Sequence, residues 1–509
     1  MAVRRAAEMP DGRGLVKPDH YISDSQNDYS GEVMMKLRLF FLLMPFISFS
    51  QPIIKSVTLV PSQTYQTIEG FGVNLNPAMW DGGHLRPVLD LLVDDLGCTQ
   101  IRFDAYGTAD WLDPARRRAD GRRPEAYLAQ VYSAPIFRDA WAVFRYLNEK
   151  GVQPHFNVSG RIPPQFAGPD GQRLVDFDGY AEMIASMLKW AREKEGLKFS
   201  LLAPFNETDL GFPEGPKLLP EDVLPAVRAL IRRLDAAGLS DIKLILLCDS
   251  TPNLDKIAPI LSEPALRSRV HAFSTHTYGN GGDEDGGWWF LEQTPYARFA
   301  EAVRSSAYNG AGIWMSEYGD LDQTGEVEFG IAWRSTRRLL KALADGFTCA
   351  MVWDAYDNFH KHDNAWTTYG LLAYDAETRL YLPKPRYYAA QQIYKYVRPG
   401  MVRIGIVAPD FDEQQTFAVF KSPLKHLRLL AFMTPDRRDL TIVGMSTVER
   451  DVRLQIDVSA LNLPVQAEVT YYRTGRKEQF KKIAGASLQN GILEAVVPEN
   501  TIFTLTTLK

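Results

Sequence analysis

The chain has 509 residues, which is too long for one ordinary domain and suits a large domain with a smaller partner. Its hydrophobic content of 45% and charged content of 23% are typical of a soluble globular protein. The net charge of -5 carries no signature of polyanion binding, which argues against a nucleic-acid partner.

The first fifty residues read as a leader outside the fold. Residues 1–33 are polar and show no periodicity, and two basic residues then precede an apolar run over 39–49. Small residues follow this run, as in a signal-peptidase site, and the run is too short for a comfortable membrane span. We expect translation to start at Met34 or Met35, with cleavage near Ser50 and export to the periplasm or the medium. An uncleaved signal anchor is the alternative.

The chain contains only three cysteines: Cys98, Cys248 and Cys349. Two lie inside apolar, strand-like runs and the third lies just before one. They have no metal-ligand spacing, so we expect three buried free thiols.

Strand-like and helix-like segments alternate eight times along the middle of the chain. The candidate strands are 68–76, 99–107, 152–160, 199–207, 242–250, 270–278, 312–319 and 348–357. The segments between them, such as 85–97, 177–196 and 221–238, repeat apolar residues at the helical spacing, and several end in glycine. This pattern predicts an α/β fold, a closed (β/α)8 TIM barrel rather than an open sheet.

The pattern changes after residue 395 to short β runs separated by turn residues, which predicts an all-β sandwich. The runs are 402–409, 415–422, 427–434, 439–446, 453–459, 467–474, 492–498 and 501–508. The segment 56–68 is also strand-like, so we expect the sandwich to use both chain ends. The predicted divisions are a leader over 1–50, sandwich strands over 51–66, the catalytic barrel over 67–397 and the sandwich over 398–509.

Two glutamates close apolar runs of the predicted barrel. Glu207 ends the fourth strand and Glu317 ends the seventh. Carboxylates at the carboxyl ends of barrel strands are how this fold presents an acid/base and a nucleophile to a sugar. We therefore predict a retaining glycoside hydrolase with the two carboxyl groups roughly 5–5.5 Å apart. The alternatives are a loop carboxylate at Glu207 and an arginine-paired structural carboxylate at Glu317.

Other strand ends supply candidate substrate contacts. Asn206 carries an amide suited to a sugar 2-hydroxyl. Arg102 is placed to hold the nucleophile ionised, although an ion pair with Asp104 is the alternative. His276 and Tyr278 end the sixth strand, where a tyrosine hydroxyl can donate to the nucleophile; a structural histidine is the alternative reading.

Further candidates lie around the predicted barrel mouth. Trp353 ends the eighth strand and is expected to form the floor of the −1 subsite, unless it packs in the barrel core. The weaker candidates are Asn74, Asn76, Asn157, Arg161, Trp288 and Trp289, the two tryptophans lying in a glycine-rich loop after the sixth strand. The polar stretch 357–370 reads as a sugar-binding loop rather than a metal site, because no strand-fixed ligand set accompanies it. We expect no metal and no cofactor.

The motifs together resemble a known family. The segment Gln-Thr-Ile-Glu-Gly-Phe-Gly at the first strand, the Phe-Asn-Glu and Ser-Glu-Tyr-Gly-Asp strand ends and the two-ended sandwich resemble clan A glycoside hydrolases, most closely family 30, over nearly all of 55–509. The resemblance implies a β-linked substrate, Glu207 as acid/base and Glu317 as nucleophile. It also implies a −1 subsite lined by Arg102, Asn206, Tyr278 and Trp353.

The chain departs from the family in two loops. The loop over 157–166 lacks the usual Ser-Pro-Pro-Trp-like segment, and Thr208 stands where a proline is more usual after the acid/base. The subfamily and the sugar therefore stay open, and families 5, 39 and 79 remain alternatives.

Two other functions compete with glycoside hydrolysis. One is a non-catalytic carbohydrate-binding barrel, against which the presence of both glutamates counts. The other is a lyase or aldolase, which requires a strand-end lysine or a metal cluster, and neither is present among the eight strand ends. We therefore expect a carbohydrate substrate, with the sugar, endo or exo action and the oligomeric state open.

Overall fold

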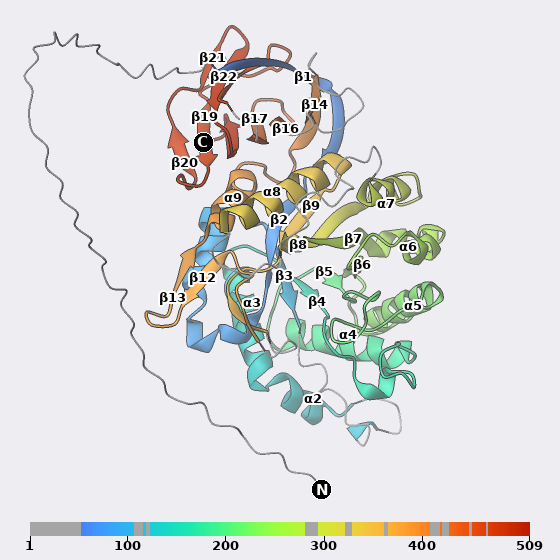
Figure 1. Cartoon of the computed structure of the whole chain (residues 1–509). Coiled ribbons are helices and arrows are strands. Elements are labelled where there is room, and N and C mark those ends of the chain that lie inside the picture. Colours follow the sequence, from blue (N-terminus) through green and yellow to red (C-terminus); the bar gives the residue numbers. More distant parts are fainter. Residues whose placement is uncertain are drawn as a thin grey trace, which may run out of the picture. The chain divides into compact units, whose positions relative to one another are not determined.

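The computed structural model describes residues 52–105, 116–118, 123–279, 294–320, 328–360, 365–407, 418–419, 427–446, 450–464 and 467–509 (Figure 1). The predicted leader lies outside these residues, so the signal peptide stays a prediction. In the described ranges, no helix has the length and apolarity needed to cross a membrane.

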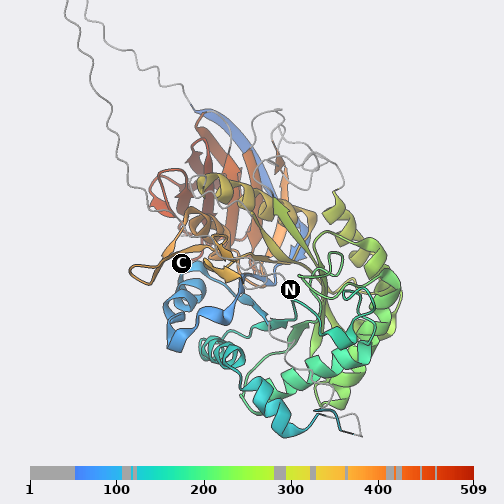
Figure 2. The same ribbon diagram turned by 60° about the horizontal axis from the view of Figure 1, so that its bottom comes forward.

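Eight parallel strands close into a barrel, which confirms the predicted TIM-barrel fold. They are β2 (Gly70–Leu75), β3 (Gln100–Asp104), β4 (His155–Asn157), β5 (Leu201–Ala203), β6 (Lys243–Asp249), β7 (Val270–Gly279), β8 (Gly312–Asp320) and β9 (Cys349–Val352). The ring is closed because β2 pairs with both β3 and β9. Figure 2 shows helices around the outside of these strands.

The barrel strands are buried on both faces, as parallel strands covered by helices must be. Their inward residues form a small apolar cluster that includes Ala272, Trp314 and Met351, while their outward residues join the large core beneath the helices. Cys98, Cys248 and Cys349 are buried free thiols, as predicted.

Helices connect the strands. They are α1 (Arg86–Asp90), α2 (Glu125–Tyr132), α3 (Pro135–Glu149), α4 (Phe177–Glu193), α5 (Pro220–Ala236), α6 (Leu254–Leu261), α7 (Pro295–Arg304), α8 (Glu328–Asp345) and α9 (Pro385–Tyr394). Side chains cap three of the described helices: Asp176 accepts from the Gly179 N–H of α4, Asn253 from the Lys256 N–H of α6, and Thr294 from the Ala297 N–H of α7.

The observed bounds of several elements differ from the predicted ones, and three differences bear on the site or its surroundings. The segment 85–97 is not one regular α-helix: α1 is followed by the π-helical turn η3 (Leu91–Leu96), where the Tyr387 hydroxyl of α9 donates to the Leu91 carbonyl at 3.0 Å. Strand β5 ends at Ala203 rather than at residue 207, because Pro204 follows and has no N–H for the ladder. Strand β8 continues to Asp320, three residues beyond Glu317.

The second fold unit is a β-sandwich, as predicted, and both chain ends contribute to it. Its strands are β1 (Ile53–Thr67), β14 (Val402–Val407), β15 (Ala418–Val419), β16 (Leu427–Met433), β17 (Leu440–Ser446), β18 (Val452–Asp457), β19 (Thr470–Thr474), β20 (Lys481–Ile483), β21 (Ser487–Gln489), β22 (Ile492–Val497) and β23 (Thr501–Thr506). Strand β1 pairs antiparallel with β14 and parallel with β18, so the N-terminal strand lies inside the C-terminal sheet. The short strands β20 and β21 were not predicted.

Two hairpins follow the last barrel strand. One joins β10 (Asn358–His360) to β11 (Ala365–Thr367), and the other joins β12 (Leu372–Asp375) to β13 (Leu380–Pro383). Helix α9 then leads into the sandwich. Its buried Gln392 donates to the Thr474 hydroxyl at 2.8 Å and accepts from the Thr504 hydroxyl at 2.7 Å, which ties the two fold units together.

Candidate active site

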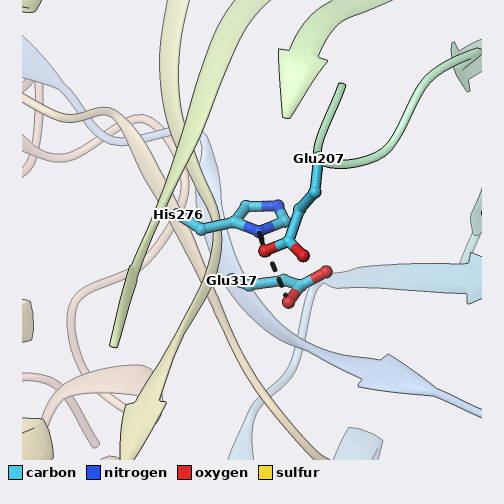
Figure 3. Close-up of side chains that lie close together, drawn as sticks. All are labelled: Glu207, His276 and Glu317. Atoms are coloured by element: carbon cyan, nitrogen blue, oxygen red, sulfur yellow. Dashed lines mark hydrogen bonds and ion pairs between the residues drawn. The ribbon is translucent and has the colours of Figure 1, made fainter. Parts of the chain in front are cut away.

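Side chains from the carboxyl ends of β5, β7 and β8 meet at one place (Figure 3). The Nδ1 atom of His276 lies 2.8 Å from Oε1 of Glu207 and 3.5 Å from Oε2 of Glu317. One carboxylate oxygen of each glutamate lies within 4.8 Å of the other. The barrel therefore brings the two predicted carboxylates together, 110 residues apart in sequence.

Two donors occupy the Glu317 carboxylate. Arg102 Nη1 donates to Oε1, and the Tyr278 hydroxyl donates to Oε2. The guanidinium is fully buried and also donates to Asn74 Oδ1 at 2.6 Å and to Asn206 Oδ1. A buried cation and a hydroxyl thus stabilise the ionised form of Glu317 and fix its orientation.

Burial and these contacts shift the pKa values of Glu317, Tyr278 and His276. Burial, the largest influence, raises the pKa of Glu317 above its usual value, and the neighbouring Glu207 adds to the rise; His276, the Arg102 charge and the Tyr278 hydrogen bond oppose it. Burial and the neighbouring Glu317 raise the pKa of Tyr278 well above its usual value, so the hydroxyl stays a donor. Burial lowers the pKa of His276 to about 4, so its ring is neutral at pH 7.

Glu207 has a different environment. The pKa of its carboxyl is raised to about 7, mainly by burial and also by the charges of Asp209 and Asp249, while the Arg102 charge opposes the rise. In contrast to Glu317, Glu207 accepts no hydrogen bond from an arginine or lysine among the described residues; its neighbour is the neutral His276. The surroundings of the two carboxyl groups therefore differ: a buried guanidinium and a hydroxyl bind Glu317 and favour its ionised form, whereas a neutral ring lies beside Glu207.

The Asn206 amide is held from two sides. Its Oδ1 accepts from Arg102 Nη2, and its Nδ2 donates to the Glu214 carbonyl at 3.1 Å. The preceding strand end contributes a second oriented amide, because Asn157 Nδ2 donates to Asp104 Oδ1 at 2.7 Å. In the described part of the chain, Asn157 Oδ1 is buried without a hydrogen-bond partner.

The remaining candidates make contacts with residues other than the two glutamates. Trp353 packs against His360 with ring centroids 5.3 Å apart. Asn74 donates to the Ser316 and Val352 carbonyls, and therefore braces the barrel rim. Asn76 bonds the Asn358 side chain, and Arg161 lies 5.6 Å from the Phe212 ring. Trp288 and Trp289 lie outside the described residues.

The prediction from sequence missed a polar group beside Glu207. Hydrogen bonds and ion pairs surround the loop that carries Glu207, and they involve Thr208, Asp209, Asp249 and Lys256. Asp249 is the last residue of a barrel strand, the same signal that singled out the two glutamates.

Glu207, His276 and Glu317 lie close enough for a cation to bridge them. Arg102 and Tyr278 already use both oxygens of Glu317, however, and the buried guanidinium supplies the positive charge. The donor set thus suits a pair of reacting carboxyl groups better than a metal centre, which requires free anionic ligands.

No family model matches the chain, and no curated protein matches it. Solved structures match its fold. A family 30 subfamily 8 xylanase from Clostridium acetobutylicum matches with a TM-score of 0.61 at 16% identity, over 89% of this chain and 99% of the other. An endo-β-1,6-glucanase matches with a TM-score of 0.59 at 16% identity, over 90% of this chain and 96% of the other. A conserved exported protein from Bacteroides fragilis matches with a TM-score of 0.63 at 14% identity, over 89% of this chain and 100% of the other. These similarities confirm the predicted fold.

Proposed function

We propose that the protein is a retaining β-glycoside hydrolase acting on a polysaccharide or oligosaccharide, with Glu207 as acid/base and Glu317 as nucleophile. The observation that carries this proposal is the unequal pair: two carboxyl groups with oxygens within 4.8 Å, one bound by a buried arginine and the other with a pKa of about 7. Such close spacing leaves no room for the water that an inverting pair must hold between sugar and base.

In the first step, the protonated Glu207 carboxyl gives its proton to the glycosidic oxygen as that bond breaks. Glu317 Oε attacks the anomeric carbon and forms a glycosyl ester, while Arg102 and Tyr278 hold the carboxylate in line until attack. In the second step, Glu207, now ionised, removes a proton from water. The resulting hydroxide displaces Glu317 from the anomeric carbon, which restores both carboxyl groups and retains the β configuration.

The −1 sugar is proposed to lie between these groups. Asn206 is oriented to contact the 2-hydroxyl, because its amide is fixed by Arg102 and the Glu214 carbonyl. Asn157 offers a buried acceptor to another sugar hydroxyl. Trp353 provides an aromatic face for the C–H side of the ring.

The fold neighbours support a carbohydrate substrate, since their names describe a xylanase and an endo-β-1,6-glucanase. We also propose export, on the strength of the leader in the sequence and of a neighbour described as an exported protein. A non-catalytic carbohydrate-binding role is the competing function, and the polarised pair counts against it, because binding alone requires no difference between the two carboxyl groups.

The test is product release from a panel of β-linked polysaccharides, oligosaccharides and aryl β-glycosides, with wild type and Glu317→Gln side by side. Glu69→Gln is the matched control, because Glu69 is a partly buried glutamate that precedes β2 at the opposite end of the barrel and bonds His271. Activity in wild type and the control that disappears in Glu317→Gln supports the proposal. Equal activity in all three proteins removes the nucleophile assignment, and binding without turnover favours the competing function.

A further inference from the structure

The residues that follow Glu207 are fastened to the end of strand β6. Glu207 has a φ of 41°, a left-handed backbone conformation that is unfavourable for a residue with a Cβ. Its N–H donates to the Cys248 carbonyl at 2.9 Å, and its carbonyl accepts from Leu210 at 2.9 Å. An unfavourable conformation persists only where surrounding contacts over-determine it, so the neighbouring contacts matter for where the carboxyl points.

Thr208 forms the second attachment. Its hydroxyl donates to Asp249 Oδ1 at 2.6 Å and accepts from Lys256 Nζ at 2.8 Å. Lys256 also pairs with Asp249 Oδ2 at 3.2 Å, and all three side chains are buried. A buried lysine, carboxylate and hydroxyl in mutual contact resist separation, because the loss of any one of them leaves a buried charge or donor without its partner.

Asp209 forms the third attachment. Its Oδ1 accepts from the Ser250 N–H at 3.0 Å, and its Oδ2 accepts from the Ser250 hydroxyl. Residues 207, 208 and 209 are therefore bonded in order to residues 248, 249 and 250. This polar attachment begins where the sequence has Thr208 in place of the proline that the resemblance leads one to expect.

We propose that four positioning residues hold the Glu207 carboxyl in place for proton transfer to the leaving group. They are Thr208, Asp209, Asp249 and Lys256, and together they are called the Glu207 latch. The inference rests on the proposed function and goes beyond it, because it assigns the control of the acid/base to side chains that do not touch the sugar.

The latch also carries charge. Asp209 and Asp249 both raise the pKa of Glu207, in addition to the larger effect of burial, so the latch helps to keep the acid protonated near neutral pH. The charged and titratable groups around Glu207, from every element packed against it, are Arg102 on β3, Asp209 on its own loop, Asp249 on β6, Lys256 on α6, His276 and Tyr278 on β7, and Glu317 on β8.

The test compares two aryl β-glycosides of the active sugar, one with a good leaving group (2,4-dinitrophenol) and one with a poor leaving group (phenol). Departure of phenol requires the acid, whereas departure of dinitrophenol does not. We expect Thr208→Val to lower kcat/KM for the phenyl substrate by about 10- to 100-fold and for the dinitrophenyl substrate by only a few-fold. Thr208→Ser, which keeps the hydroxyl, stays near wild type.

Removing charge gives a second readout. We expect Asp249→Asn to move the basic limb of the kcat/KM profile toward lower pH by roughly 0.5–1 unit, because loss of a neighbouring negative charge lowers the pKa of Glu207. The matched control is Lys341→Met, which breaks the buried Lys341–Asp345 pair of α8 at the other end of the barrel. It leaves both the leaving-group preference and the pH profile unchanged.

Glu207→Ala separates failure of the latch from failure of the proposed function. If Glu207→Ala discriminates between the two leaving groups and the latch variants do not, the latch inference is overturned while the function stands. If Glu207→Ala itself does not discriminate, the acid/base assignment fails. Folding of each variant is checked by thermal unfolding, and Asp209→Asn, at a half-buried position, replaces Thr208→Val if the latter does not fold.

Discussion

His276 Nδ1 lies 2.8 Å from Glu207 Oε1, with the ring fully buried. Burial lowers the pKa of His276 to about 4 and raises the pKa of Glu207 to about 7. At neutral pH the pair therefore shares one hydrogen bond between a neutral ring and a carboxyl that is about half protonated. This contact orients the Glu207 carboxyl, the proposed acid, without a cation, whereas Arg102 donates to Glu317.

The pH dependence follows from the direction of these shifts. As the proposed general acid, Glu207 acts only when protonated, and its protonated form is lost as pH rises through a pKa of about 7. We expect kcat/KM for a poor leaving group to fall above neutral pH. In Glu207→Gln, assayed on a dinitrophenyl glycoside, that basic limb is absent. If kcat/KM of the variant still falls above neutral pH, the fall is caused by a group other than Glu207.

Glu207→Ala is expected to respond to an added nucleophile. The glycosyl ester on Glu317 forms from an activated substrate without acid help, but its hydrolysis lacks the base. Azide needs no base, so it increases turnover at least about tenfold and yields a β-glycosyl azide. Glu317→Ala assayed with azide is the comparison, and it yields an α-glycosyl azide or nothing. A β-azide from Glu317→Ala contradicts the assignment.

Arg102 and Glu317 are expected to be coupled in stability. Arg102→Met leaves a buried carboxylate without its cation, which lowers the free energy of unfolding by about 3–5 kcal/mol. In the Glu317→Gln background, Arg102→Met lowers the free energy of unfolding by less, because no buried carboxylate is left without its cation. Thermal unfolding of wild type, both single variants and the double variant measures this coupling. Additive losses would show that the pair is not coupled.

Gln392 is expected to matter for stability and not for turnover. Gln392→Leu removes its side-chain bonds to Thr474 and Thr504, two hydroxyls that keep other partners, at a cost of about 1–3 kcal/mol for the two lost hydrogen bonds. Denaturant unfolding and kcat/KM are measured together, with the exposed Gln153→Leu as control. A large fall in kcat/KM of Gln392→Leu at unchanged stability would contradict this expectation and would indicate that the sandwich contributes to turnover.

The sequence predicted the barrel and its two glutamates for one physical reason. The carboxyl ends of parallel strands share one rim, so polar residues that close apolar runs meet there, as Glu207 and Glu317 do. The Glu207 latch was not predictable in this way. Thr208 and Asp249 are ordinary polar residues 41 positions apart, and their bond depends on the register of β5 and β6.

Local irregularities were also beyond the sequence pattern. The π-helical turn at Leu91–Leu96 lies within an ordinary helical periodicity, and a tertiary contact from Tyr387 accompanies it. The strands Lys481–Ile483 and Ser487–Gln489 are short and largely exposed, so they lack the apolar alternation that marks a strand.

The most direct test of the central claim is the configuration of the first-formed product. A proton NMR time course on the active β-glycoside, recorded before the reducing end equilibrates, observes the anomeric proton of the released sugar. The close, unequal pair of Glu207 and Glu317 predicts that the β-anomer appears first and the α-anomer only later by mutarotation. Initial appearance of the α-anomer would contradict a covalent intermediate on Glu317.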